Sequence, residues 1–239
     1  MDLSKMPAVI MAGGLGTRIR ERVKDVPKPM ISFAGKPFLH YKIMQLKRAG
    51  FYNIIFTIGY MGEQIQEYFK DGGAFGLYIR YSVENVPLGT GGGLKQVASL
   101  ISGPFFMING DTFYELDWQD MANTYETTHA THMMMLADSI NPGQEGTVKQ
   151  DAEGYIVEFE EKSPQLQGKC VNGGVSILDP IIFDMIPQGK CSIEKDVFPK
   201  IAHQYSLKGY NYRGYFIDVG TPRFYDQFQQ DIASGRVKP

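Results

Sequence analysis

The feature that most constrains the fold is the alternation of short apolar runs with helical patterns in the first half of the chain. The apolar runs cover residues 8–12, 53–58, 77–83 and 104–108. Between them, helical patterns cover residues 38–49, 63–70 and 94–101. Strands separated by helices form right-handed βαβ units, whose strands pair in parallel. The first half therefore predicts a largely parallel sheet flanked by helices.

The rhythm changes after Asp111. Four strand candidates follow one another with shorter connections, at residues 131–137, 147–149, 155–160 and 171–178. Helices are expected over residues 194–203 and 222–232. Shorter connections favour antiparallel strands, so we predict an α/β fold with a mixed sheet that is parallel at its centre. Because the chain has no repeat, low-complexity segment or linker, we expect one domain over residues 1–239.

The composition excludes several classes of protein. With 24 basic and 26 acidic side chains, the chain lacks the broad basic surface of a nucleic-acid binder. No apolar run approaches the ~18 residues of a membrane span, and the first residues have no signal-peptide pattern. Cys170 and Cys191 lack the paired spacing of a zinc site or a disulfide framework. We expect a cytoplasmic protein that binds neither nucleic acid nor membrane.

Glycine is frequent and clustered: the chain has 27 glycines, more than the usual ~7% of residues. In open α/β sheets, ligands bind beyond the carboxyl ends of the strands. Residues 13–18, 84–93 and 109–111 follow three of the predicted strands, and each segment contains glycine or polar groups. These three segments are therefore the candidate site.

The segment at residues 11–18, MAGGLGTR, can wrap a phosphate with its backbone N–H groups. It does not fit a dinucleotide fingerprint, because Ile19 stands where the third glycine is needed. It is not a P-loop, which requires Gly-Lys followed by Ser or Thr. A tight strand–helix turn is the alternative, but Arg18 adds a multi-donor cation beside the loop. Lys28, between two prolines in a stiff segment, is a second candidate for pairing with phosphate.

Two aspartates follow apolar strands. Asp111 comes after the run at residues 104–108, and Asp218 follows Tyr-Phe-Ile near the C-terminus. If the two converge, they could hold Mg²⁺, which prefers carboxylate and phosphate oxygens. Either aspartate alone is more often a turn former or a helix cap, so the sequence leaves this alternative open.

Taken together, these motifs resemble the sugar-1-phosphate nucleotidylyltransferases. The shared motifs occur in the order AGGLGTR, PKP, LGTGG, GD, EEK, NGG, EKD and IDVGTP, and they span residues 8–222. The compact length, and LGTGG followed by GDTF, most resemble the D-glycero-α-D-manno-heptose-1-phosphate guanylyltransferases. The resemblance implies a Rossmann-like nucleotidyltransferase fold.

The resemblance also implies the site residues. The NTP would be bound by Ala12, Gly13, Gly14, Gly16, Thr17, Arg18, Lys28, Glu84, Gly89, Thr90 and Asp111. Arg18 and Lys28 would be the catalytic cations. The sugar phosphate would be bound by Gly146, Glu161, Lys162, Asn172, Gly173 and Thr221. Asp111 and Asp218 would hold Mg²⁺.

The implied reaction is Mg²⁺-dependent transfer of a nucleoside monophosphate from an NTP to a sugar 1-phosphate, which releases pyrophosphate. A carboxylate such as Glu84 can accept hydrogen bonds from both guanine N1–H and the guanine amino group, whereas uracil offers one N–H donor on that edge. This favours GTP, with manno-heptose 1-phosphate as the acceptor. Glu84 could equally be a solvated charge at a strand end.

Several alternatives stay open. One is the same chemistry with CTP, UTP or dTTP and a hexose 1-phosphate such as mannose or glucose. Another is a glycosyltransferase, although the Asp-x-Asp motif common in such enzymes is absent from the sequence. The third is a non-catalytic protein that binds nucleotide sugars. The oligomeric state is also open, with a homodimer as one option.

Overall fold

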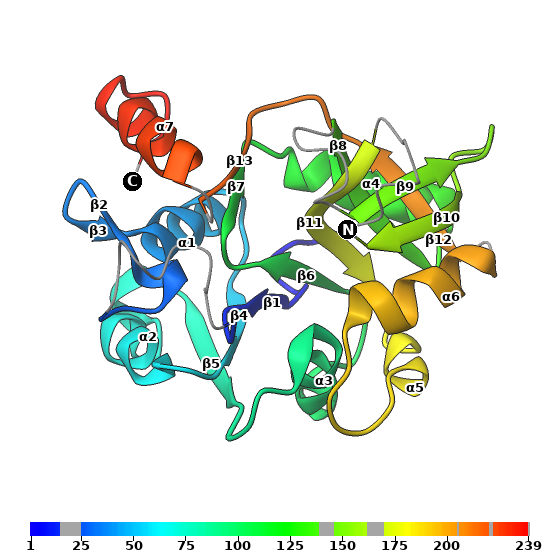
Figure 1. Ribbon diagram of the computed structural model, residues 1–239, viewed down its shortest axis with the longest axis horizontal. Coiled ribbons are helices and arrows are strands. Elements are labelled where there is room, and N and C mark those ends of the chain that lie inside the picture. The colour runs from blue at the N-terminus through cyan, green and yellow to red at the C-terminus, as the bar shows by residue number, and fades with distance from the viewer. Residues whose placement is uncertain (15–24, 139–145, 162–169, 205, 220–221, 239) are drawn as a thin grey trace.

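The computed structural model describes residues 1–14, 25–138, 146–161, 170–204, 206–219 and 222–238. At the centre of its main sheet are four parallel strands (Figure 1): β1 (Ala8–Met11), β4 (Asn53–Ile58), β5 (Tyr78–Val83) and β6 (Phe105–Asn109). β1 lies between β4 and β6, and β5 pairs with β4 at the edge. Each predicted apolar run of the first half is one of these strands.

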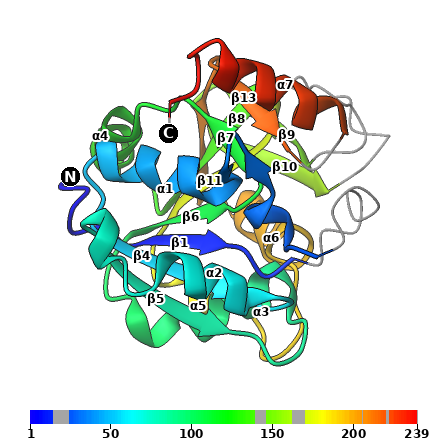
Figure 2. The same ribbon diagram turned by 90° about the vertical axis from the view of Figure 1, so that its left-hand side faces the viewer.

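Helices cover both faces of the sheet. One face carries α1 (Phe38–Arg48), α2 (Gly62–Phe69) and α4 (Trp118–Thr128), and the other carries α3 (Gly89–Gln96), α5 (Ile182–Met185) and α6 (Phe198–His203). Figure 2 shows α1 and α2 lying over the strands. Side chains alternate along a strand, so Ile10 packs under the first group of helices and Val9 under the second. β1, β4 and β6 are largely apolar, as expected for strands that are covered on both faces, whereas the edge strand β5 includes Arg80 and Ser82 and is partly exposed.

The second half of the chain extends the sheet with β8 (His132–Asp138), β9 (Gly146–Gln150), β10 (Ile156–Glu161), β11 (Cys170–Leu178) and β12 (Leu207–Asn211). β11 joins the two halves, because it runs antiparallel to β6 on one side and to β8 on the other. β9 also pairs antiparallel with β11, and β10 with β9. The predicted mixed sheet with a parallel centre is confirmed.

A separate two-stranded ribbon lies beside the main sheet. It consists of β7 (Thr112–Tyr114) and β13 (Phe216–Asp218), which run antiparallel. It packs with α1, with the hairpin β2 (Ser32–Phe33) and β3 (Lys36–Pro37), and with α7 (Pro222–Ala233) in a third apolar cluster. Phe228 of α7 contacts the rings of Phe33, Phe38 and Phe113.

Several elements differ from the expectation. α3 begins at Gly89, five residues before the predicted start at residue 94. A five-residue π-helical turn, Ile193–Val197, precedes α6 where one continuous helix was expected. α4 and β12 were not predicted at all. In the described part of the chain, no helix is both long enough and apolar enough to cross a membrane.

Candidate active site

Three side chains from distant parts of the sequence meet at the edge of the sheet. Lys28 lies in a short 3₁₀ turn, Lys28–Met30, and its side chain is almost fully buried. Its Nζ donates hydrogen bonds to Asp111 Oδ2 at 2.6 Å and to Asp218 Oδ1 at 3.2 Å. The two aspartates therefore converge on one point, and a lysine ammonium lies between them.

The ribbon brings the two aspartates together. Asp111 comes directly before β7, and Asp218 is the last residue of β13, where it pairs with Thr112. The Val219 N–H donates to the Asp111 carbonyl at 3.1 Å, which extends the pairing by one step. The backbones of Asp111 and Asp218 are therefore held at fixed positions on adjacent strands.

The charge of Lys28 is set by two opposing effects. Burial lowers its pKa, because a charged group loses hydration. The charges of Asp111 and Asp218, together with their hydrogen bonds, outweigh that loss, so the pKa of Lys28 lies above its ordinary value. Lys28 is thus a permanent cation at neutral pH.

Two carboxylates suit a Mg²⁺ ion. Among the described residues, no group of three or more His, Cys, Asp or Glu side chains could hold a metal. Mg²⁺ does not need such a group, because it commonly takes one or two carboxylates and completes its shell with phosphate oxygens and water. Asp111 and Asp218 are both partly exposed, so the donor set fits a cation that is shared with a bound phosphate.

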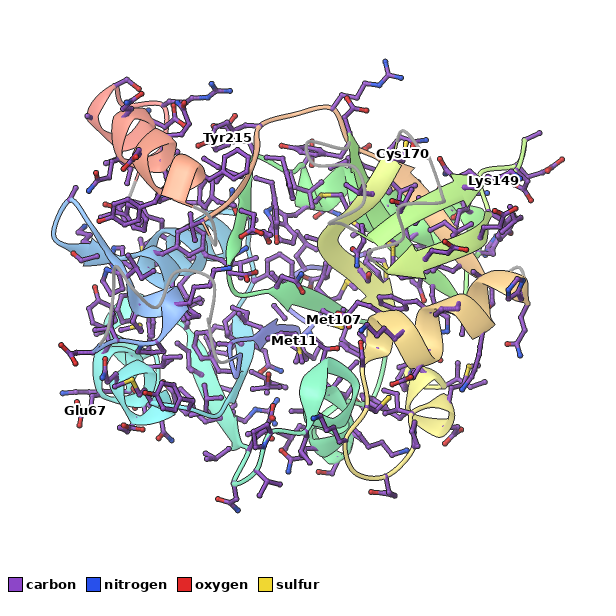
Figure 3. The ribbon with its side chains drawn as sticks, in the orientation of Figure 1. Met11, Glu67, Met107, Lys149, Cys170 and Tyr215 are labelled. Atoms are coloured by element: carbon purple, nitrogen blue, oxygen red, sulfur yellow. The ribbon has the colours of Figure 1, made fainter. Side chains whose placement is uncertain are left out.

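A cavity of 490 Å³ adjoins this cluster. It lies at the carboxyl ends of β1, β4, β5 and β6, where ligands of open α/β sheets bind. Of the residues predicted to bind the nucleotide, the cavity is lined by Gly13, Gly14, Glu84, Gly89, Thr90 and Asp111. Ala12 is buried next to them, and its N–H donates to the Thr57 carbonyl at 2.9 Å. Figure 3 shows Met11, the last residue of β1, near the centre of the molecule.

Glu84 is a half-buried carboxylate in the wall of the cavity. Its Oε2 accepts the Leu88 N–H at 3.0 Å. Oε1 faces two glycines: a Cβ on Gly13 would lie 3.0 Å from it, and a Cβ on Gly93 would lie 2.4 Å from it. Burial raises the pKa of Glu84, and the hydrogen bond from Leu88 partly opposes this. The absence of side chains on both glycines therefore makes room for this carboxylate.

The glycines of α3 allow a second loop to pack against the helix. Gly91 and Gly92 donate their N–H groups to the Cys191 carbonyl, at 2.9 and 3.2 Å. A Cβ on Gly91 would lie 2.7 Å from Cys191 Sγ, and one on Gly92 would lie 2.4 Å from the Gly189 carbonyl oxygen. The loop at residues 189–194 therefore requires glycine here, which explains a helix that begins in a segment of poor helix formers.

That loop brings two residues to the cavity that were not predicted as ligands, Lys190 and Glu194. Glu194 Oε2 accepts hydrogen bonds from the Thr90 hydroxyl at 2.5 Å and from the Ser192 hydroxyl at 2.8 Å. Glu194 belongs to the EKD motif, so the sequence carried a signal for it. Lys190 had no such signal, because only the packing of its loop brings it to the cavity.

Four of the predicted sugar-phosphate residues, Gly146, Glu161, Asn172 and Gly173, lie on strands of the antiparallel half. Gly146 and Glu161 are paired residues of β9 and β10. The pairing of β11 with β8 shifts register between Asn172 and Ser176. Gly174 has a φ of +79°, and a Cβ there would lie 2.9 Å from Asn109 Nδ2. The irregular stretch that contains Asn172 and Gly173 therefore lies against the end of β6, two residues before Asp111.

The remaining predicted residues, Gly16, Thr17, Arg18, Lys162 and Thr221, lie outside the described residues. Their roles stay predictions. The described residues bring together the two aspartates, Lys28 and one wall of the cavity.

Comparisons with known proteins give similar sequences over most of the chain. One is the D-glycero-alpha-D-manno-heptose 1-phosphate guanylyltransferase of Campylobacter jejuni, with 35% identity over 224 residues, or 93% of this chain and 98% of the relative. Another is the mannose-1-phosphate guanyltransferase of Schizosaccharomyces pombe, with 33% identity over 229 residues. That match covers 92% of this chain but 62% of the relative, less than two thirds of its length.

A solved structure agrees. The crystal structure of HddC from Yersinia pseudotuberculosis complexed with GMP-PN matches with a TM-score of 0.81 and 31% sequence identity, over 95% of this chain and 99% of that chain. The family and the fold that the motifs implied are thereby confirmed. Because the model of the nucleotidyl transferase family matches residues 7–235, this chain belongs to that family.

Proposed function

We propose that this protein transfers the guanylyl group of GTP to a sugar 1-phosphate, with manno-heptose 1-phosphate as the first-choice acceptor. The observation that carries the proposal is the cluster of Lys28, Asp111 and Asp218 at the edge of a glycine-lined cavity. Nucleotidyl transfer between two anionic substrates needs cations at this place and an open backbone surface for the phosphates.

The reaction needs no protein nucleophile. A phosphate oxygen of the sugar 1-phosphate attacks the α-phosphorus of GTP and forms a new P–O bond. The bond between the α-phosphorus and the α–β bridging oxygen breaks, and pyrophosphate leaves with that electron pair. Positioning and charge neutralisation supply most of the catalysis in such transfers. The roles of the chain are to align the two substrates and to offset their negative charge.

Lys28, Asp111 and Asp218 divide the electrostatic work. Mg²⁺ held by Asp111 and Asp218 would neutralise phosphate charge when it is bound. Lys28 stays charged at neutral pH. Its ammonium can therefore pair with a phosphate oxygen once Mg²⁺ balances the charge of the two carboxylates. Arg18 and Lys162 would add positive charge toward the leaving pyrophosphate and the sugar phosphate, respectively.

Selectivity for guanine rests on Glu84. Its carboxylate has about four acceptor sites, and the described contacts of its oxygens include one hydrogen bond, from Leu88. Acceptor capacity therefore remains for the N1–H and the amino group of guanine. The GMP-PN complex of HddC and the guanylyltransferase names of the two relatives support the same base.

The acceptor sugar is the finer part of the proposal. The C. jejuni relative is named for heptose 1-phosphate and the S. pombe relative for mannose 1-phosphate. A matrix of GTP, CTP, UTP and dTTP against several sugar 1-phosphates, read by pyrophosphate release, tests both choices. The highest turnover is expected with GTP and manno-heptose 1-phosphate. A preference for UTP would overturn the guanine assignment, and silence across the matrix would favour a binding protein.

The metal assignment has its own test. Asp111→Ala removes one of the two carboxylates and is expected to abolish Mg²⁺-dependent turnover, because the remaining aspartate holds the cation weakly. Circular dichroism should show a folded chain, since the Asp111 side chain is partly exposed. Asp184→Ala, an exposed aspartate on α5, is the matched control and should keep full activity. Near-normal turnover of Asp111→Ala would reject the assignment.

We infer further that residues 1–239 form one domain, that the protein works in the cytoplasm and that a homodimer is one possible assembly. The continuous main sheet, which includes strands from both halves of the chain, supports the single domain. Limited proteolysis tests the domain, and sedimentation velocity tests the assembly.

A further inference from the structure

A second lysine lies beneath the cluster, and the reaction described above does not use it. Lys42, on α1, is completely buried. Its Nζ donates a hydrogen bond to the Tyr114 hydroxyl at 3.1 Å and lies 4.3 Å from the centroid of the same ring. Within the described residues, Lys42 forms no ion pair with a carboxylate. Burying a lysine amine without such a partner is costly, and an apolar residue of the same size would avoid that cost.

Tyr114 is attached to α1 at two points. Lys42 binds its hydroxyl, and the Gln45 side-chain amide donates to its backbone carbonyl. Tyr114 is itself completely buried and is the last residue of β7. One turn of α1 therefore forms hydrogen bonds with both the side chain and the backbone of Tyr114.

The ribbon depends on such attachments. β7 and β13 have three residues each and form a sheet of their own, apart from the main sheet. A two-stranded ribbon is marginally stable by itself, so the elements around it must fix its position. Asp111 precedes this ribbon and Asp218 ends β13, and therefore a shift of the ribbon against α1 moves both carboxylates relative to Lys28.

We propose that Lys42 is a positioning residue for the transfer reaction, acting through Tyr114 to hold the ribbon that carries Asp111 and Asp218. This inference rests on the proposed roles of the two aspartates. It explains why a lysine stands where a packing residue would suffice. The hydrogen bond gives the contact a direction and a length, which an apolar contact with the same ring would not.

A double-mutant cycle tests the proposal. Tyr114→Phe removes one hydroxyl from the link and retains the ring, and Lys42→Met removes the ammonium with little change in length. Each is expected to lower kcat by about ten- to a hundredfold, because small misplacements of catalytic groups have effects of this size. The double variant should be no slower than the slower single variant, since both changes cut the same link. KM for the sugar 1-phosphate should stay within about twofold in all three variants.

A second readout does not depend on turnover. Binding of Mn²⁺ to the enzyme–GTP complex, followed by electron paramagnetic resonance without acceptor, should weaken several-fold in Tyr114→Phe, which keeps the Lys42 side chain. Tyr125→Phe is the matched control: its hydroxyl donates to the Thr131 carbonyl at 3.2 Å at the end of α4, away from the ribbon. It should match the wild type in kcat and in Mn²⁺ binding.

Each of three outcomes would overturn either the role of Lys42 or the proposed function, and the measurements distinguish the three. If the wild type turns over GTP but both single variants keep kcat within about twofold, Lys42 is structural only. If the losses multiply in the double variant, the two residues act separately. If the wild type shows no turnover with any NTP, the proposed function itself fails, and the Mn²⁺ measurement still reports whether the ribbon carries a metal site.

Discussion

Lys28 and Lys42 belong to two neighbouring regions, the edge of the sheet and the core beneath it, and they differ in charge. Both are buried. At the edge, Lys28 contacts two carboxylates, and its pKa lies above the ordinary value. In the core, burial lowers the pKa of Lys42 to about 7, and the charge of Asp111 opposes this in part. Burial alone therefore does not decide whether a lysine is charged; the distance to a carboxylate does.

The difference has a functional meaning for each region. Under the proposed function, the cation at the edge would pair with an incoming phosphate, and the carboxylates that hold it there would bind the metal. The core keeps a weakly charged lysine whose contact is a tyrosine hydroxyl and ring. The first lysine is suited to act on the substrates, and the second to hold the groups that act on them.

The largest expected effect comes from removing the cation at the edge. Lys28→Met should lower kcat/KM by about a hundred- to a thousandfold, the range for losing a preorganised electrostatic contact to the reacting phosphates. Steady-state pyrophosphate release measures the loss, and circular dichroism verifies folding. Lys195→Met, on the surface of the π-helical turn, removes a lysine that lines no part of the cavity and should leave kcat/KM unchanged. Activity of Lys28→Met within about threefold of the wild type would contradict the contrast between the two lysines.

The next effect concerns stability in the core. Between pH values near 7 and the ordinary lysine pKa of 10.5, the unfolded chain binds a proton at residue 42 that the folded chain does not. The unfolding free energy of the wild type therefore rises with pH relative to that of Lys42→Met, by about 1.4 kcal/mol per pH unit. The stability advantage of Lys42→Met should shrink by about 3 kcal/mol between about pH 7 and about pH 9.5.

Urea denaturation at several pH values measures this change. Lys28→Met serves as the comparison, since a pKa above 10.5 keeps Lys28 charged in both the folded and the unfolded state over this range. The contribution of Lys28 is lost only as the pH rises through its folded pKa, so the difference from wild type should be constant there. A constant difference for Lys42→Met as well would show that Lys42 is charged in the fold.

The smallest effect concerns Glu84 in the wall of the cavity that adjoins the lysine–aspartate cluster. The Glu84 carboxylate packs against Gly13 and Gly93. In Gly93→Ala the new methyl group would meet Glu84 Oε1, so the carboxylate must turn. We expect kcat/KM for GTP to fall several-fold and that for UTP to change less. In Gly103→Ala the added methyl group meets nothing within 4 Å, which makes it the matched control. Equal losses for the two nucleotides would mean that Glu84 does not read the base.

β1, β4 and β6 were predictable because they are buried on both faces and therefore read as largely apolar runs. α4 could also have been predicted: Trp118, Met121, Ala122 and Tyr125 have helical spacing, and the Asp117 side chain caps the helix by accepting the Asp120 N–H. The start of α3 could not have been predicted, because glycine disfavours helices. Glycine is needed there because the helix packs against a loop about a hundred residues further along the chain.

In the site, the segments at strand ends were predictable, and their partners were not. Asp111 follows an apolar run, so its place at the edge of the sheet could be inferred. That Lys28 would lie between the two aspartates depends on the ribbon, whose strands are too short to be recognised reliably. Lys190 reaches the cavity through a tertiary contact of its loop with α3, and no local pattern signals it.

The lysine–aspartate cluster has a consequence for how the protein is made. Lys28 is 83 residues from Asp111 and 190 residues from Asp218 along the chain. Contacts this distant close large loops and form late in folding. During synthesis the cluster cannot be complete until Asp218, 190 residues after Lys28, has left the ribosome. The cluster is therefore complete only after every described strand of the main sheet has been made, because the last of them along the chain, β12, ends at Asn211.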